Sequence, residues 1–128
     1  MPQYMLLLYE PNDARPTAED VAAAMPKWIE YTQGLKDDGV FVAGEALERP
    51  EIATTVRARD GEVQVTDGPF AETREALGGF YAIDVPDLDT ALSYARRVPN
   101  VHYGSVEVRP VWNQSRPRAE SAGAQTRA

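Results

Sequence analysis

Two kinds of hydrophobic pattern alternate along this chain, extended runs and helical stripes. Residues 4–9 form a nearly unbroken apolar run, which predicts a central strand covered on both faces. Residues 54–59 and 62–66 are rich in β-branched residues and flank Asp60-Gly61, a pair suited to the positive backbone angles of a tight turn, so they predict a hairpin. Three further strands are expected, at residues 40–43, 79–85 and 106–112.

Helical stripes separate these strands. Thr17, followed by acidic residues, predicts the start of a first helix that ends at Asp38-Gly39. Pro26 removes a backbone donor inside it, so we expect a kink or a new start there. Asp87 predicts the cap of a second helix, which Pro99-Asn100 ends, and residues 73–77 predict a single helical turn. The two stripes are Val21, Met25, Trp28, Thr32 and Leu35, then Leu88, Ala91, Leu92, Ala95 and Val98.

The order strand, helix, strand, hairpin, strand, helix, strand predicts an α+β fold, a ferredoxin-like sandwich with an inserted β-hairpin. Two helices cover only one face of such a sheet, yet the run at residues 4–9 is apolar on both faces. The uncovered face therefore favours a homodimer in which a second copy of the chain supplies the cover.

Composition narrows the class of protein. The chain has 128 residues, 43% of them apolar, and no run approaches the roughly 20 apolar residues of a membrane-spanning helix. The first residues show no basic leader, and cysteine is absent, so we expect a cytoplasmic protein without disulfides. A net charge of −7 argues against a nucleic-acid partner. We expect one domain at residues 1–113 and a flexible C-terminal tail at 114–128.

The segment from Val65 to Tyr81, which contains Asp67-Gly68-Pro69-Phe70, resembles the signature of the YCII-related proteins of the DGPF type. Further blocks of the chain resemble that family in the same order, and the likeness spans about residues 3–112. These blocks are residues 4–9, 42–45, 53–56 and 104–111.

The resemblance implies a dimeric α+β barrel with a cleft between sheet and helices. It assigns no activity, and it implies a regulatory context because such proteins are often encoded beside extracytoplasmic-function sigma factors. Narrower YCII relatives carry a His on the first helix and an Asp near its end, proposed as a catalytic pair. Asp37 could match that Asp, but Trp28 stands about where the His would be, so the pair is not carried over.

Asp67 begins the first candidate site, because Gly-Pro holds its carboxylate on a rigid turn and Glu72 and Arg74 follow closely. The structural alternative is that Asp67 accepts the backbone amides of its own turn. Glu107 and Arg109 share one side of the last strand, opposite Val106 and Val108. They either form a structural ion pair or line a pocket for a polar ligand.

Tyr81 is a further candidate for the wall of this pocket and equally a core residue, as are Trp28 and Tyr31. His102 is the single histidine, so it is a candidate general base, although an exposed loop position is the more ordinary role. No ligand spacing indicates a metal site, and no cofactor is indicated.

Three functions compete. The first is a protein that binds or transforms a small polar molecule through Asp67, Glu72, Arg74, Tyr81, Glu107 and Arg109. The second is a non-catalytic regulatory or partner-binding protein associated with a sigma factor. The third, a cofactor-free oxygenase, rests on fold analogy alone. Whether any reaction is catalysed stays open, and Asp67 and His102 are the catalytic candidates if one is.

The segment after residue 113 generates the first prediction. It has no apolar periodicity and few groups to bury, so truncation after Gln114 should leave the melting temperature unchanged within error. Thermal denaturation of the truncated and full-length proteins checks this. A drop of several degrees would show that the segment docks on the domain.

Overall fold

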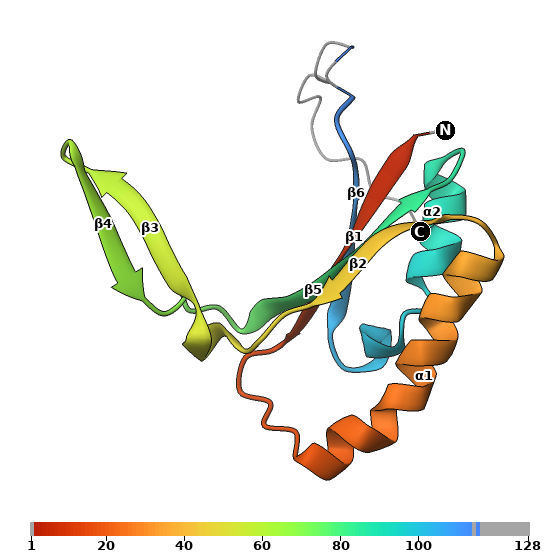
Figure 1. The fold of residues 1–128 in the computed structure, drawn as a ribbon, viewed down its shortest axis with the longest axis horizontal. Helices are drawn as coiled ribbons and strands as arrows, with labels where there is room; N and C mark the ends of the chain where they lie inside the picture. The colour runs from red at the N-terminus through yellow and green to blue at the C-terminus, as the bar shows by residue number, and fades with distance from the viewer. Residues whose placement is uncertain (1, 114, 116–128) are drawn as a thin grey trace.

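A computed structural model describes residues 2–113 and 115 and shows a mixed α+β architecture, as predicted (Figure 1). The strands of these residues are β1 (Gln3–Pro11), β2 (Phe41–Ala46), β3 (Thr54–Arg59), β4 (Glu62–Asp67), β5 (Glu75–Asp84) and β6 (Ser105–Pro110). The helical segments are α1 (Ala18–Asp37), α2 (Leu88–Ala95) and the 3₁₀ turns η1 (Pro50–Ile52) and η2 (Pro99–His102). The expected tail at 114–128 lies outside the described residues except for position 115.

The main sheet has the order β2-β5-β1-β6, and each neighbouring pair is antiparallel. Directly opposed residues share a face, so the register assigns each side chain to one side. Leu6 lies opposite Tyr81 and Val108, and this row faces the helices. Leu7 lies opposite Phe80 and Glu107, and this row belongs to the other face. We call the side without helices the open face.

The core lies between the sheet and the two α-helices, which cover the same face (Figure 1). Leu6 and Ile83 from the sheet are fully buried, and Leu35 from α1 is 1% exposed. Tyr4, Trp28, Tyr31, Val106 and Val108 pack partly buried around this cluster. The open face carries no helix, although Met5 and Leu7 on it are apolar and half-buried.

Both ends of α1 follow from local sequence. Thr17 Oγ1 accepts from Asp20 N at 3.1 Å, and Thr17 N donates to Asp20 Oδ2 at 2.9 Å, which completes a capping box. At the other end, Gly39 has φ +73°, and Val40 N donates to the Leu35 carbonyl across it, a Schellman motif. The expected new start at Pro26 is wrong, because α1 runs through it as one helix.

The predicted helical turn at residues 73–77 is also wrong. Glu75 and Ala76 already belong to β5, because β1 extends far enough to pair with them through Pro11 and Glu10. The second helix ends at Ala95, before the end of the apolar stripe predicted for it. Val98, the last residue of that stripe, lies beyond the helix and is fully buried. The last strand ends at Pro110 rather than at residue 112.

The predicted hairpin is confirmed as β3–β4, with Val56 opposite Val65 and a turn at Asp60-Gly61, both of which have positive φ. It forms a sheet of its own and projects away from the main sheet (Figure 1). We call residues 54–67 the arm.

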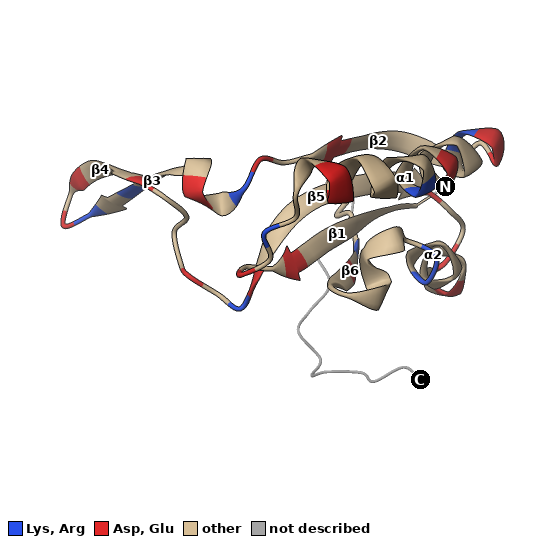
Figure 2. Ribbon diagram, turned by 90° about the horizontal axis from the view of Figure 1, so that it is seen from below, with Lys and Arg blue, Asp and Glu red and all other residues tan. Residues whose placement is uncertain are grey.

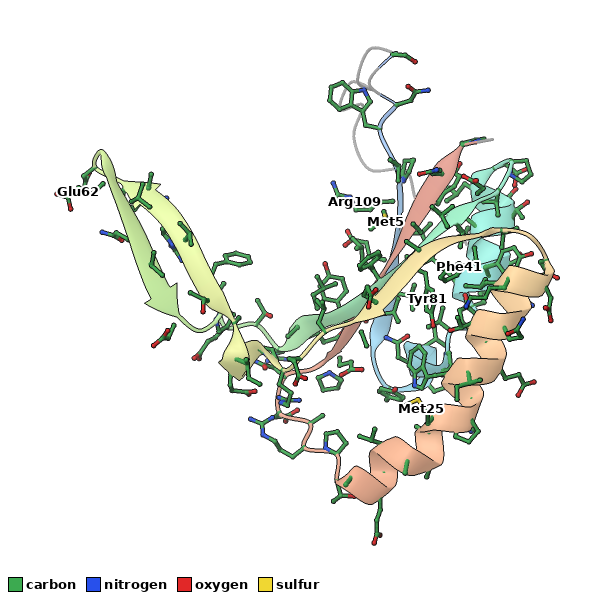
Figure 3. The ribbon with its side chains drawn as sticks, viewed as in Figure 1. Met5, Met25, Phe41, Glu62, Tyr81 and Arg109 are labelled. Atoms are coloured by element: carbon green, nitrogen blue, oxygen red, sulfur yellow. The ribbon has the colours of Figure 1, made fainter. Side chains whose placement is uncertain are left out.

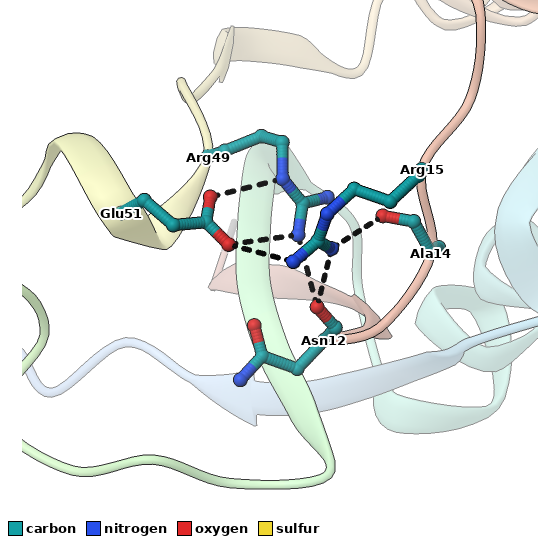
Figure 4. A network of polar contacts seen from close by, with 5 residues as sticks. All are labelled: Asn12, Ala14, Arg15, Arg49 and Glu51. Atoms are coloured by element: carbon teal, nitrogen blue, oxygen red, sulfur yellow. Dashed lines mark hydrogen bonds and ion pairs between the residues drawn. The ribbon is translucent and has the colours of Figure 1, made fainter.

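A polar network holds the base of the arm (Figure 4). Arg49 and Arg15 both contact the Glu51 carboxylate, at 3.0 and 3.2 Å, and both donate to the Asn12 carbonyl. The Arg49 hydrogen bond is the main cause that lowers the pKa of Glu51. This network joins the connection after β1 to the connection that leads into the arm.

The packing of β5 generates the second prediction. Ile83 is fully buried between sheet and helices, so Ile83→Ala should lower the free energy of unfolding by about 2 to 5 kcal/mol. Chemical denaturation measures this loss. Ile29→Ala on the exposed side of α1 is the matched control, because Ile29 is 61% exposed and its loss should stay within about 0.5 kcal/mol. Equal losses in the two variants would contradict the assigned core.

Candidate functional site

Three polar side chains meet on the open face. Tyr9 comes from β1, and Glu107 and Arg109 come from the neighbouring strand β6. Tyr9 Oη donates to Glu107 Oε1 at 3.2 Å. Figure 3 shows Arg109 beside Met5, on the side of the sheet away from Phe41 and Tyr81. We call Tyr9, Glu107 and Arg109 the open-face cluster.

This cluster arises from the alternation of β6. Val106 and Val108 pack against the core, so Glu107 and Arg109 must project from the other side. The sequence therefore predicted their common side correctly. The structure adds Tyr9, which sequence reasoning missed because its position opposite Ser105, next to Glu107, depends on the register between β1 and β6.

The electrostatics of the cluster centre on Tyr9. Burial is the main cause that raises the pKa of Tyr9, and the hydrogen bond and negative charge of Glu107 raise it further, while Arg109 lowers it. Within residues 2–113, Arg109 makes no hydrogen bond or ion pair. The cluster thus offers a carboxylate acceptor with one oxygen engaged and a guanidinium whose donors are available.

Apolar residues fill the middle of this face. Met5 lies opposite Ala82 and Arg109, and Leu7 lies opposite Phe80 and Glu107. On the far edge, Glu45 of β2 lies opposite Phe80. The open face is therefore an apolar strip with charged residues along both edges.

Asp67 lies elsewhere, at the base of the arm. Its carboxylate has no hydrogen-bond or ion-pair partner in the described part of the chain, and Gly68 N donates to the Ala53 carbonyl instead. The structural alternative, in which Asp67 accepts its own turn's amides, is therefore not observed. Glu72 and Arg74 are exposed on the connection between β4 and β5.

Tyr81 faces the opposite side of the sheet from Glu107 and Arg109. It is 8% exposed, its ring packs edge-on against Tyr31 at 5.4 Å, and its hydroxyl hydrogen-bonds Thr32 Oγ1 at 2.7 Å. Gly44 makes room for this ring, because a Cβ there would come within 2.7 Å of Tyr81. The expected ligand-binding residues therefore fall into three places in one chain, which are the arm and its connection, the core, and the open-face cluster.

His102 lies exposed at the end of η2, on a groove of about 980 Å³ between α1 and the segment from α2 to η2. The groove is open and mixed in character, and its lining includes Ile29, Tyr31, Asp37, Tyr94, Arg97 and His102. Sequence reasoning missed it because its walls come from three separate segments. Burial is the main cause that raises the pKa of Tyr31, whose hydroxyl donates to the Tyr94 carbonyl at 2.9 Å.

The described residues contain no group of three or more His, Asp or Glu side chains placed to hold a metal ion. None of their helices is long and apolar enough to cross a membrane. Figure 2 shows Lys and Arg interspersed with Asp and Glu along the elements rather than gathered in one basic stripe.

The fold and the open-face cluster together define an α+β protein. The described helices cover one face of its main sheet, and charged residues lie at the edge of the other face. The family model of the YCII-related domain matches residues 2–115, so the chain belongs to the YCII-related family. A relative, described as uncharacterized protein R00369 from Rhizobium meliloti (strain 1021), is 54% identical over 94 residues. That match covers 72% of this chain and 70% of the relative.

The open-face cluster generates the third prediction, in which removal of the Glu107 charge and removal of the Arg109 charge shift the pKa of Tyr9 in opposite directions. Glu107→Gln removes a hydrogen-bonded negative charge and should lower the pKa of Tyr9 toward 10.0, whereas Arg109→Gln should raise it further. Titration by NMR with ¹³C-labelled tyrosine rings reads Tyr9 separately from the other tyrosines. Glu45→Gln, across the face on β2, is the control that leaves the value unchanged. Shifts of the same sign in both variants would contradict the arrangement.

Proposed function

We propose that this protein is a homodimer of ferredoxin-like protomers, assembled as an α+β barrel, that binds a small polar molecule between its open faces. The observation that carries the proposal is the open-face cluster. A guanidinium without a hydrogen-bond or ion-pair partner among the described residues lies beside a hydrogen-bonded carboxylate, at the edge of an apolar strip. An ordinary surface needs no such arrangement, because isolated charges on it are simply solvated.

The homodimer is supported by the composition of the open face. Met5, Leu7 and Phe80 form an apolar strip on the side without helices. A contiguous apolar surface of this kind marks an interaction site, and closed two-fold dimers are the commonest soluble assembly. The same surface patch would occur on both copies, so one interface can cover both open faces.

The ligand chemistry follows from the two available groups. Arg109 presents a planar fork of N–H donors that matches carboxylate or phosphate oxygens. Glu107 keeps one carboxylate oxygen for a hydroxyl or amino donor, since Tyr9 engages the other. A small molecule that carries both an acidic group and a donor, such as an amino or hydroxy acid, satisfies both sides. Enclosure between two sheets would strengthen these contacts by excluding water.

A thermal-shift screen tests this function and is the fourth prediction. Small amino acids, hydroxy acids, carboxylates, phosphates and amines are added in turn to the parent and to Arg109→Gln. A ligand at 100 times its Kd stabilises the folded state by about 2.7 kcal/mol, which is a shift of several degrees. The parent should respond to at least one class, and Arg109→Gln should lose that response.

Arg96→Gln, at the exposed end of α2, is the matched control and should respond like the parent. Calorimetric titration of the responding compound then measures affinity for all three proteins. A parent that responds to none of these classes, or an Arg109→Gln variant that responds as strongly as the parent, refutes the proposed site. The first of these results favours the regulatory alternative, in which the protein has no small-molecule ligand.

A further inference from the structure

The arm has one apolar face that its own protomer leaves exposed. In the register of β3 and β4, Val56 lies opposite Val65 and Ala58 opposite Val63, so these four side chains share a face. Val56 is 63% exposed, Val65 is 68% exposed and Val63 is 72% exposed. The opposite face is polar, with Arg57, Arg59, Glu62 and Gln64.

Such an arm needs a partner surface. An isolated two-stranded hairpin is marginally stable in water, and its apolar face gains stability only when something covers it. The arm projects away from the main sheet, and the network of Arg15, Arg49 and Glu51 at its base ties it to the connection after β1 (Figures 1 and 4). The protomer therefore holds the arm out instead of folding it back.

Charge indicates which surface the arm fits. Asp67 lies opposite Thr54 and two residues beyond Val65, so it projects from the apolar face of the arm. The open face presents an apolar strip through Met5 and Leu7, and at its edge the unpaired Arg109 lies next to Glu107, which already accepts from Tyr9. Neither Asp67 nor Arg109 has a hydrogen-bond or ion-pair partner within residues 2–113. Apolar and charged parts of the two surfaces thus complement each other.

We infer that the arm of each protomer packs on the open face of a second copy and brings Asp67 to Arg109 of the partner subunit. This inference rests on the homodimer of the proposed function and deepens it, because the binding site is then incomplete in a single chain. A guanidinium has five N–H donors, so Asp67 can engage two and leave the others for a ligand. Two such contacts, related by a two-fold axis, cover both arms and both open faces.

The first test, and the fifth prediction, uses light scattering at micromolar concentration. The parent should have twice the mass of 14.1 kDa, and Val65→Asp, which places a charge in the centre of the arm's apolar face, should have the mass of one chain. Gln64→Asp is the matched control, because it adds the same charge to the next residue on the opposite face and should leave the dimer intact. Circular dichroism verifies that each variant keeps its secondary structure.

A charge exchange tests the specific contact without relying on Val65→Asp. Asp67→Arg and Arg109→Asp should each weaken dimerisation by at least about tenfold, because like charges then meet across the interface. The double variant restores opposite charges and should return to within a few-fold of the parent. Dilution series followed by sedimentation measure all three dissociation constants. A double variant as weak as the single ones overturns the contact.

The outcomes separate this inference from the function it rests on. A monomeric parent refutes the homodimer and the arm contact together. A dimeric parent whose Val65→Asp variant also stays dimeric overturns the arm contact alone, and the open faces then meet without it. An arm that binds an unrelated protein instead would leave the parent monomeric when pure, which also counts against the inference.

Discussion

The structure of this chain depends on β1, a central strand with apolar residues on both faces. The described helices cover only one face of the sheet to which β1 belongs. Leu6 and Leu8 meet the helices and form the core, while Met5 and Leu7 on the same strand face outward. Leu6 and Leu8 stabilise the fold because they are buried, whereas Met5 and Leu7 leave an apolar surface that is only half-buried in one chain. The core and the open face are therefore two consequences of one nearly unbroken apolar run.

The arm adds a second incomplete surface. Arg15, Arg49 and Glu51 contact one another at its base while its valines stay exposed, so one chain leaves both the arm and the open face partly uncovered. Exposed ion pairs contribute little energy singly. At this place they link the connection after β1 to the connection that leads into the arm.

Local chemistry made much of this architecture predictable. The hairpin followed from Asp60-Gly61, the start of α1 from Thr17, and the shared side of Glu107 and Arg109 from strand alternation. Features set by long-range register were not predictable. The strand at Glu75 forms because Pro11 is there to pair with it, and Tyr81 lies in the core because of its pairing with Leu6. The expected site residues lie in separate parts of the chain for the same reason, since no local pattern specifies the direction of the hairpin relative to the main sheet.

In the proposed homodimer, covering the open face would change the electrostatic balance of the cluster, and this balance bears on the proposed ligand. Burial makes every unpaired charge costly, so Glu107 depends on the hydrogen bond from Tyr9 and on the nearby charge of Arg109. Without the arm, one carboxylate and one guanidinium nearly cancel, and a ligand without net charge, such as a zwitterionic amino acid, suits the site. With Asp67 of the partner subunit added, the cluster holds two carboxylates and one guanidinium, a surplus of one negative charge. A buried surplus of that sign favours a ligand with a net positive charge, so the position of the arm decides between zwitterionic amino acids and simple amines.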